Sequence, residues 1–192
     1  MVTNITKGQV FDLQKEDPEL NSVFVGIGWD VGENDGTQFD LDACAFLMGS
    51  DGLVSEASDF IYFRNLRHPT GAVVHSGDNT TGDGEGDDEA ITVDFSLLPD
   101  SVSRIAFTVS IYEAFERQQT FGQIRNAYIR FYDPEVGEIF RFDLGEEFSD
   151  DTAIVFGELV KKAEGGWAFA ALGEGLQGGI IALSRRFGVF RK

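Results

Sequence analysis

The stretch FDLDACAFLM, residues 39–48, decides the fold class of this chain. Apolar and polar residues alternate at its start, which puts the carboxylates of Asp40 and Asp42 on one face of an extended strand. The opposite face carries only apolar side chains, those of Phe39, Leu41 and Ala43. The stretch therefore predicts a β-strand with one buried face and two carboxylates side by side on the other.

The same alternation recurs along the chain, in short apolar runs separated by clusters of Gly, Asp and Asn. This pattern predicts strands rather than helices. The nine predicted strands cover residues 23–29, 39–48, 60–63, 90–95, 103–112, 126–132, 139–144, 152–161 and 166–172.

Two segments depart from this pattern and predict helices. Residues 113–120 contain good helix formers between two predicted strands, and residues 176–187 end with two arginines followed by a glycine. A mainly all-β protein of this kind buries its apolar faces best as an antiparallel two-layer β-sandwich. We therefore expect a single domain over residues 1–192, with a short connecting helix and a C-terminal helix.

The chain has 192 residues, of which 33 are acidic and 15 are basic, for a formal net charge of −18. Nucleic acid requires a basic surface, so general DNA or RNA binding is excluded. Because 42% of the residues are hydrophobic and 18 are Phe, the chain is also not a disordered acidic tail. The composition predicts a folded acidic protein.

The sequence predicts a soluble protein that stays where it is made. No apolar stretch approaches the roughly 18 residues that span a bilayer, and the first residues do not form a secretory leader. The single cysteine, Cys44, cannot form an internal disulfide, which agrees with a reducing cytoplasm. Since Cys44 lies in an alternating stretch, we expect a buried and inert thiol.

The negative charge is concentrated in the first half of the chain. Residues 1–103 hold 20 acidic and 4 basic side chains, whereas residues 104–192 hold 13 and 11. Within the first half, the loop GDNTTGDGEGDDE, residues 77–89, combines six acids with four glycines and has no base. An alternative explanation of this acidic loop is that it only keeps the protein soluble. Solubility, however, is favoured by charges spread over the whole surface and not by charges concentrated in one loop.

A cation would turn the repulsion within this loop into attraction. Two carboxylates about 4 Å apart repel by ~4 kcal/mol at an effective dielectric constant of 20. Glycines let the backbone wrap around one centre, and hard oxygen ligands in a flexible loop favour Ca²⁺ over Mg²⁺. The loop is not an EF-hand, because the obligatory glycine at position 6 of that motif would be Asp83.

A second oxygen-rich patch lies upstream, in residues 28–43. The two aspartates of its predicted strand follow a turn that contains Asp30, Asn34 and Asp35. Because the loops of a sandwich gather at its two ends, we expect both patches at one end, where they would share ions. We expect His75, just before the acidic loop, to be a surface imidazole.

Segments along nearly the whole chain resemble the TerD family of tellurium-resistance and general stress proteins. They are VGIGWD (25–30), DGTQFDLDACAFL (35–47), SDFIYF (58–63), HSGDNTTGDGEGDDE (75–89), FTVSIYEAFERQQTFGQIRNAYIR (107–130), TAIVFGEL (152–159) and GEGLQGG (173–179). The resemblance implies a bacterial, cytoplasmic β-sandwich that binds two or more Ca²⁺ and acts in tellurite and chemical-stress resistance. It implies no enzymatic activity. It also implies other tellurium-resistance proteins as partners, at the inner face of the membrane.

Carried over residue by residue, the resemblance places cation ligands at Asp40, Asp42, Asp78, Asn79, Asp87, Asp88 and Glu89, with Asp30 as a further candidate. Strand parity puts Glu89 on the core side with Ile91 and puts Asp88 on the opposite side. One of these two carboxylates is therefore expected to support the site without contacting the ion.

Two other functions stay open. The first alternative is a Ca²⁺-dependent docking module for a membrane or a protein, with the ion as a bridge. The second is a metal-dependent hydrolase built on clustered carboxylates. The hydrolase is disfavoured because the chain has only two imidazoles, those of His68 and His75. A catalytic transition-metal site usually has more nitrogen ligands than that.

Overall fold

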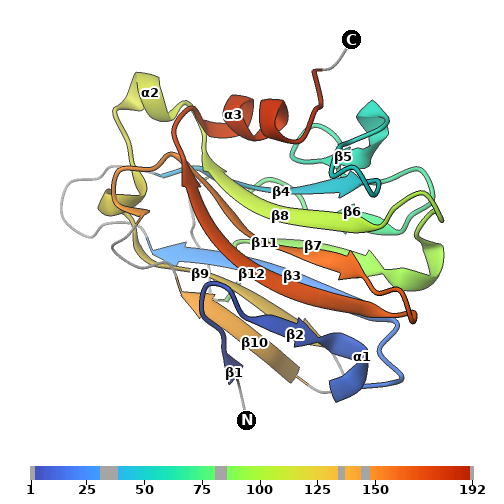
Figure 1. Ribbon diagram of the computed structural model, residues 1–192. Helices are drawn as coiled ribbons and strands as arrows, with labels where there is room; N and C mark the ends of the chain where they lie inside the picture. Colours follow the sequence, from blue (N-terminus) through green and yellow to red (C-terminus); the bar gives the residue numbers. More distant parts are fainter. Residues whose placement is uncertain (1–2, 31–38, 81–85, 134–136, 144–147, 191–192) are drawn as a thin grey trace.

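The chain folds into two stacked β-sheets with few helices, as Figure 1 shows. The computed structural model describes residues 3–30, 39–80, 86–133, 137–143 and 148–190. Neighbouring strands are antiparallel in both sheets, except for the short first strand, which runs parallel to its neighbour. The predicted antiparallel β-sandwich is confirmed.

The two sheets contain six strands each. Sheet A has the order β1 (Thr3–Asn4), β10 (Gly137–Asp143), β9 (Arg125–Asp133), β3 (Ser22–Asp30), β7 (Glu89–Asp94) and β6 (Val73–His75). Sheet B has the order β2 (Val10–Asp12), β12 (Trp167–Leu176), β11 (Ala153–Lys161), β8 (Arg104–Ile111), β4 (Leu41–Met48) and β5 (Phe60–Ile61). The helices are α1 (Leu13–Glu16), α2 (Ala114–Arg117) and α3 (Gly179–Arg186).

Packed aromatic rings fill the main core between the sheets. Phe131 of sheet A lies with its ring centroid 4.4 Å from those of Phe140 and Phe169, and the latter two are 4.9 Å apart. All three side chains are fully buried. Such pairs contribute about 0.5–1.5 kcal/mol each beyond the burial of their area, so this cluster helps to hold the two layers in register.

Both faces of β4 are buried, although only one of them faces the other sheet. Leu41, Ala43, Ala45 and Leu47 belong to the main core. The alternate positions Cys44, Phe46 and Met48 form a second cluster with Leu183 and Phe187, contributed by α3 and its C-terminal end. In Figure 1, α3 lies over sheet B on the side away from sheet A. This helix is the reason that the thiol of Cys44 is buried, as expected.

All nine predicted strands are present, and the segment 113–120 contains α2 as predicted. Three strands were not predicted, namely β1, β2 and β6, because two or three residues are too few to show an alternation. The helix predicted for residues 176–187 begins later, at Gly179. Leu176 pairs with Ala153 instead, so β12 extends four residues beyond its predicted end at residue 172 and includes the first residue of the predicted helix.

We predict that Phe131→Ala lowers the free energy of unfolding by about 3–5 kcal/mol, the usual cost of removing a buried aromatic ring. Urea denaturation followed by tryptophan fluorescence measures the change. Phe24→Ala is the matched control, because the Phe24 ring stacks on Tyr132 but is only half-buried. Equal losses in the two variants would contradict the assignment of Phe131 to the core.

Candidate metal centre

The carboxylates of Asp40 and Asp42 lie at the start of β4 and are both buried. Asp40 is fixed by its backbone carbonyl, which accepts a hydrogen bond of 2.8 Å from the N–H of Tyr112. Asp42 stands opposite Ser110 in the ladder between β4 and β8. The two aspartates share a strand face with Cys44, so the predicted alternation is confirmed.

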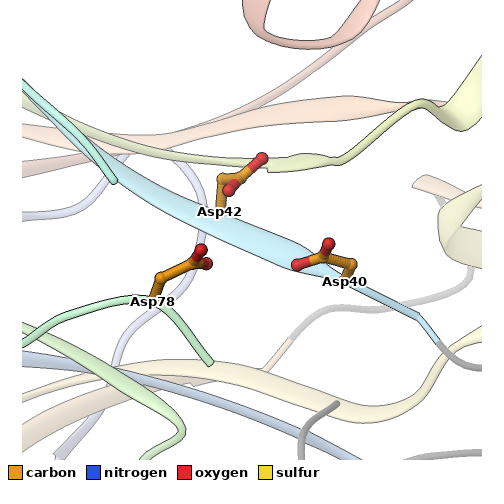
Figure 2. A group of neighbouring side chains, drawn as sticks. All are labelled: Asp40, Asp42 and Asp78. Atoms are coloured by element: carbon orange, nitrogen blue, oxygen red, sulfur yellow. The ribbon is translucent and has the colours of Figure 1, made fainter. Parts of the chain in front are cut away.

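A third carboxylate, that of Asp78, reaches this pair from the segment that follows β6. Figure 2 shows the Asp78 side chain pointing toward the strand that carries Asp40 and Asp42. One oxygen of each carboxylate lies within 4.8 Å of the other two. Ca²⁺ binds oxygen at 2.3–2.6 Å, so two ligands of one ion are at most about 5 Å apart. The three carboxylates therefore have the spacing of ligands around one ion.

The environment of the two strand carboxyls raises the pKa of both. Burial raises the pKa of Asp42 to about 8, and the negative charges of Glu89 and Asp40 add to the effect. Burial also raises the pKa of Asp40 to about 6, with Asp78 as the next cause. A cation at this point would replace protons, because it stabilises the ionised carboxylates.

Glu89 ties the acidic loop to the start of β4. Its side chain is 1% exposed, and its Oε2 accepts a hydrogen bond of 2.7 Å from the N–H of Ala43. Its Oε1 accepts a hydrogen bond of 3.2 Å from the N–H of Asn79. Since Glu89 belongs to sheet A and Ala43 to sheet B, this carboxylate joins the two sheets beside the three aspartates.

His75 is buried against Glu89, so the prediction of a surface imidazole is wrong. The residue is 3% exposed. Its Nδ1 accepts a hydrogen bond of 3.1 Å from the N–H of Gly77, which leaves the ring proton on Nε2. Nε2 lies 3.1 Å from the carbonyl oxygen of Ala43 and 3.4 Å from Glu89 Oε2. The short strand β6, which was not predicted, turns this side chain inward.

Asp88 contacts sheet A through its carboxylate. Its Oδ2 accepts a hydrogen bond of 2.9 Å from the N–H of Trp29, in β3. Its Oδ1 accepts a hydrogen bond of 3.2 Å from the side-chain amide of Asn79. Asp88 and Glu89 therefore contact different sheets, in agreement with the opposite sides that strand parity predicts for their side chains.

Asp87 is bound to Arg130, a residue of β9. Its Oδ1 lies 2.8 Å from Nε of the guanidinium, and its Oδ2 lies 2.9 Å from Nη2. The hydroxyl of Tyr128 donates a further hydrogen bond of 2.9 Å to Oδ1. Arg130 and Tyr128 were not among the predicted site residues.

Two glycines of β3 make room for these contacts. A Cβ atom at Gly26 would lie 2.1 Å from Asp87 Oδ2, and one at Gly28 would lie 2.5 Å from the ring of Tyr128. Glycine inside a strand often marks such a close approach. The two alternate glycines in VGIGWD were therefore the one sequence signal for this part of the site.

Ser110 is another residue that the sequence analysis missed. Its side chain is fully buried opposite Asp42, and its Oγ finds no hydrogen-bond partner within the described part of the chain. A buried hydroxyl without a partner is unfavourable unless a ligand or water satisfies it. A cation bound to Asp42, or the water that such an ion carries, would provide that partner.

Comparison with known proteins assigns the chain to a family. The profile of the TerD domain matches residues 1–187. The chain belongs to the TerD family. It is 43% identical over 190 residues to the tellurium resistance protein TerD of Serratia marcescens, with 98% of each chain covered. It is 44% identical over 191 residues to general stress protein 16U of Bacillus subtilis (strain 168), again with 98% of each covered.

A solved structure shares the TerD fold of this chain. The crystal structure of a homologue of telluride resistance protein (TerD) from Streptomyces coelicolor A3(2) superimposes with a TM-score of 0.70 at 24% identity. The match covers 86% of this chain and 95% of that one. The resemblance found in the sequence is thus confirmed for family and fold.

The remaining predicted ligands of the TerD chain are placed only in part. Asp30 is the last residue of β3, and its side chain lies outside the described residues. Asn34 and Asp35 also lie outside them.

Within the described residues, no helix is both long and apolar enough to cross a membrane.

We predict that the metal-free TerD chain loses stability as the pH rises from about 5 to 8. Asp42 and Asp40 have raised pKa values, about 8 and about 6, so between about pH 4 and these values the folded state binds more protons than the unfolded state. Each pKa unit corresponds to about 1.4 kcal/mol. Melting curves in EDTA measure the slope, and Asp42→Asn should flatten it. An unchanged slope in that variant would contradict the assignment.

Proposed function

We propose that this chain is a non-enzymatic Ca²⁺-binding protein of stress response, and that Asp40, Asp42 and Asp78 hold the ion. The main support is the convergence of three carboxylate oxygens within 4.8 Å, two of them from buried side chains. The role in tellurite and chemical-stress resistance rests on family membership, since relatives are named tellurium resistance and general stress proteins. We place the protein in the cytoplasm or at the inner face of the membrane.

The donor set favours Ca²⁺ over transition metals. The three aspartates supply hard oxygen ligands. The one histidine at this point, His75, has both ring nitrogens engaged in contacts with the protein. Backbone carbonyls and water would complete the six to eight ligands that Ca²⁺ takes.

The same imidazole contacts support a role without catalysis. His75 is held by Gly77 and Ala43, and His68 lies between Thr70 and Asp59 with Nε2 3.2 Å from Asp59 Oδ1. Both imidazoles are buried. A hydrolase would need a general base that reaches substrate, and these two rings serve local structure instead.

We predict that Ca²⁺ titrated into the EDTA-stripped chain gives a saturable calorimetric signal and raises the melting temperature. A ligand that binds only the folded state stabilises it by about 2.7 kcal/mol at 100 times its dissociation constant. Asp40→Asn combined with Asp42→Asn removes two of the three ligands, so we expect at least about a 100-fold loss of affinity.

A matched control combines Asp100→Asn with Glu164→Gln, which changes the charge by the same amount at two exposed positions. This variant should bind Ca²⁺ like the wild type. Absence of binding at millimolar Ca²⁺, or equal binding in the two double variants, would contradict the proposed site.

As a second candidate, we propose that Ca²⁺ docks the protein on an anionic membrane, alone or with other tellurium-resistance proteins. Phe115 of α2 favours this function, because it is 90% exposed. Figure 1 shows α2 projecting from the sandwich. On the same helix, Arg117 is near enough to act on the charge of Asp40. An exposed aromatic ring beside a cation site could enter the headgroup layer once the ion bridges to lipid.

We predict that vesicles containing phosphatidylserine sediment the protein in Ca²⁺ but not in EDTA if docking occurs, and that Phe115→Ser abolishes the difference. Phe190→Ser is the control, because Phe190 is also exposed but lies near the end of the chain. If the fraction bound is the same with and without Ca²⁺, the ion serves only the protein's own structure and this candidate fails.

A further inference from the structure

The last three carboxylates of the acidic loop each reach a different strand. Asp87 binds Arg130 of β9, Asp88 accepts from a backbone N–H of β3, and Glu89 accepts from one of β4. The residues therefore fasten one side of the loop to the two sheets.

The Asp87–Arg130 pair is the strongest of these contacts. Two nitrogens of the guanidinium face the two carboxylate oxygens at 2.8 and 2.9 Å, and both side chains are largely withdrawn from water. Bidentate charge-assisted pairs of this geometry are directional and stronger than neutral hydrogen bonds. Tyr128 adds its hydroxyl, whose one proton lies between two acceptors, Asp87 Oδ1 at 2.9 Å and the carbonyl oxygen of Gly86 at 3.0 Å.

We propose that the Asp87–Arg130 pair, seated on Gly26, is a latch that positions the ion-binding aspartate Asp78. The latch rests on the proposed Ca²⁺ site, and it assigns Asp87 a positioning role in place of a ligand role. Both oxygens of Asp87 are already satisfied by a resident cation, the guanidinium of Arg130.

A continuous set of contacts leads from the latch to Asp78. Asp87 precedes Asp88 and Glu89, whose carboxylates accept hydrogen bonds from the side-chain amide and the backbone N–H of Asn79. Asn79 directly follows Asp78. In addition, Ser76 and Ala90 exchange hydrogen bonds on the other side of Asp78. With one side of the loop fixed, the other side has little freedom.

The latch matters because the ion site repels itself. When Asp40 and Asp42 are ionised and no cation is bound, their negative charges would push the exposed Asp78 side chain away. Contacts that hold the backbone of residues 78–79 in place oppose that movement before the ion arrives. Less ordering is then left for the ion to impose, so affinity rises.

Calcium affinity tests the latch directly. We expect Asp87→Asn and Arg130→Gln each to weaken Ca²⁺ binding by about 10–100-fold, the usual effect of residues that orient a ligand. Because the two side chains act as a pair, the double variant should lose little more than either single variant. Wild-type affinity in Asp87→Asn would overturn the proposal.

Terbium luminescence separates positioning from ligation. Lifetimes of bound Tb³⁺ in H₂O and D₂O report the number of coordinated water molecules. At saturation, Asp87→Asn should leave that number at the wild-type value, whereas Asp42→Asn should raise it. A raised number in Asp87→Asn would make Asp87 a ligand and would overturn its role in the latch.

Gly26→Ala tests the same contact from the other strand. Its new Cβ would occupy the place of the Asp87 carboxylate, so it should weaken Ca²⁺ binding as Asp87→Ala does. In the Asp87→Ala background, Gly26→Ala should weaken Ca²⁺ binding little further, because the carboxylate that would clash with the new Cβ is gone. A full additional loss in that background would show that Gly26 acts through something other than Asp87.

Arg104→Gln is the matched control for a lost cross-strand ion pair. Arg104 pairs with Glu158 at the first residue of β8, whereas Asp42 faces Ser110 near the last. We expect this variant to be less stable but to bind Ca²⁺ like the wild type. If it loses as much affinity as Arg130→Gln, the latch has no special connection to the ion site.

Hydrogen exchange in EDTA distinguishes failure of the latch from failure of the Ca²⁺ site. The N–H groups of Trp29 and Asn79 donate hydrogen bonds to the carboxylates of Asp88 and Glu89. In metal-free Asp87→Asn both should exchange faster than in the wild type. Unchanged exchange would overturn the latch even if Ca²⁺ binds, whereas faster exchange with no Ca²⁺ binding in the wild type would overturn only the proposed function.

Discussion

Repulsion among carboxylates at a buried strand end is the constraint on which the site depends. Asp40 and Asp42 are enclosed at the start of β4, and Asp78 brings a third carboxylate within 4.8 Å. Buried like charges cannot all stay ionised without a partner, and the raised pKa values of the two strand carboxyls express this conflict. Protons or a cation relieve it, and only a cation leaves the carboxylates ionised as ligands.

The carboxylates near the site have different roles because they differ in burial and in their partners. Glu89 and Asp88 accept hydrogen bonds from backbone N–H groups, so each carboxylate orders a strand next to it. Asp87 has a guanidinium as its partner. The three aspartates at the start of β4 and after β6 have no such partners among the described contacts and face one another. The same residue type thus fixes the scaffold at one position and is available for an ion at another.

The fold followed from local pattern, whereas the partners within the site did not. Period-two alternation located β4 and the shared face of Asp40 and Asp42, because each strand carries its own burial pattern. The inward turn of His75 depends on β6, whose three residues are too short for such a pattern. The pairing of Asp87 with Arg130 joins residues 43 positions apart, and only sheet order brings them together. Sequence parity cannot supply that order.

The acidic composition also has a different meaning once the contacts are known. Residues 78–89 contain six acids, which would suggest several ions if each acid were a ligand. Three of them, Asp87, Asp88 and Glu89, have partners in the protein itself. Backbone N–H groups and an arginine stabilise a carboxylate without any metal. Under our proposal, the loop therefore contains more acids than ion ligands, and the ligands are carboxylates that have no partner among the described contacts.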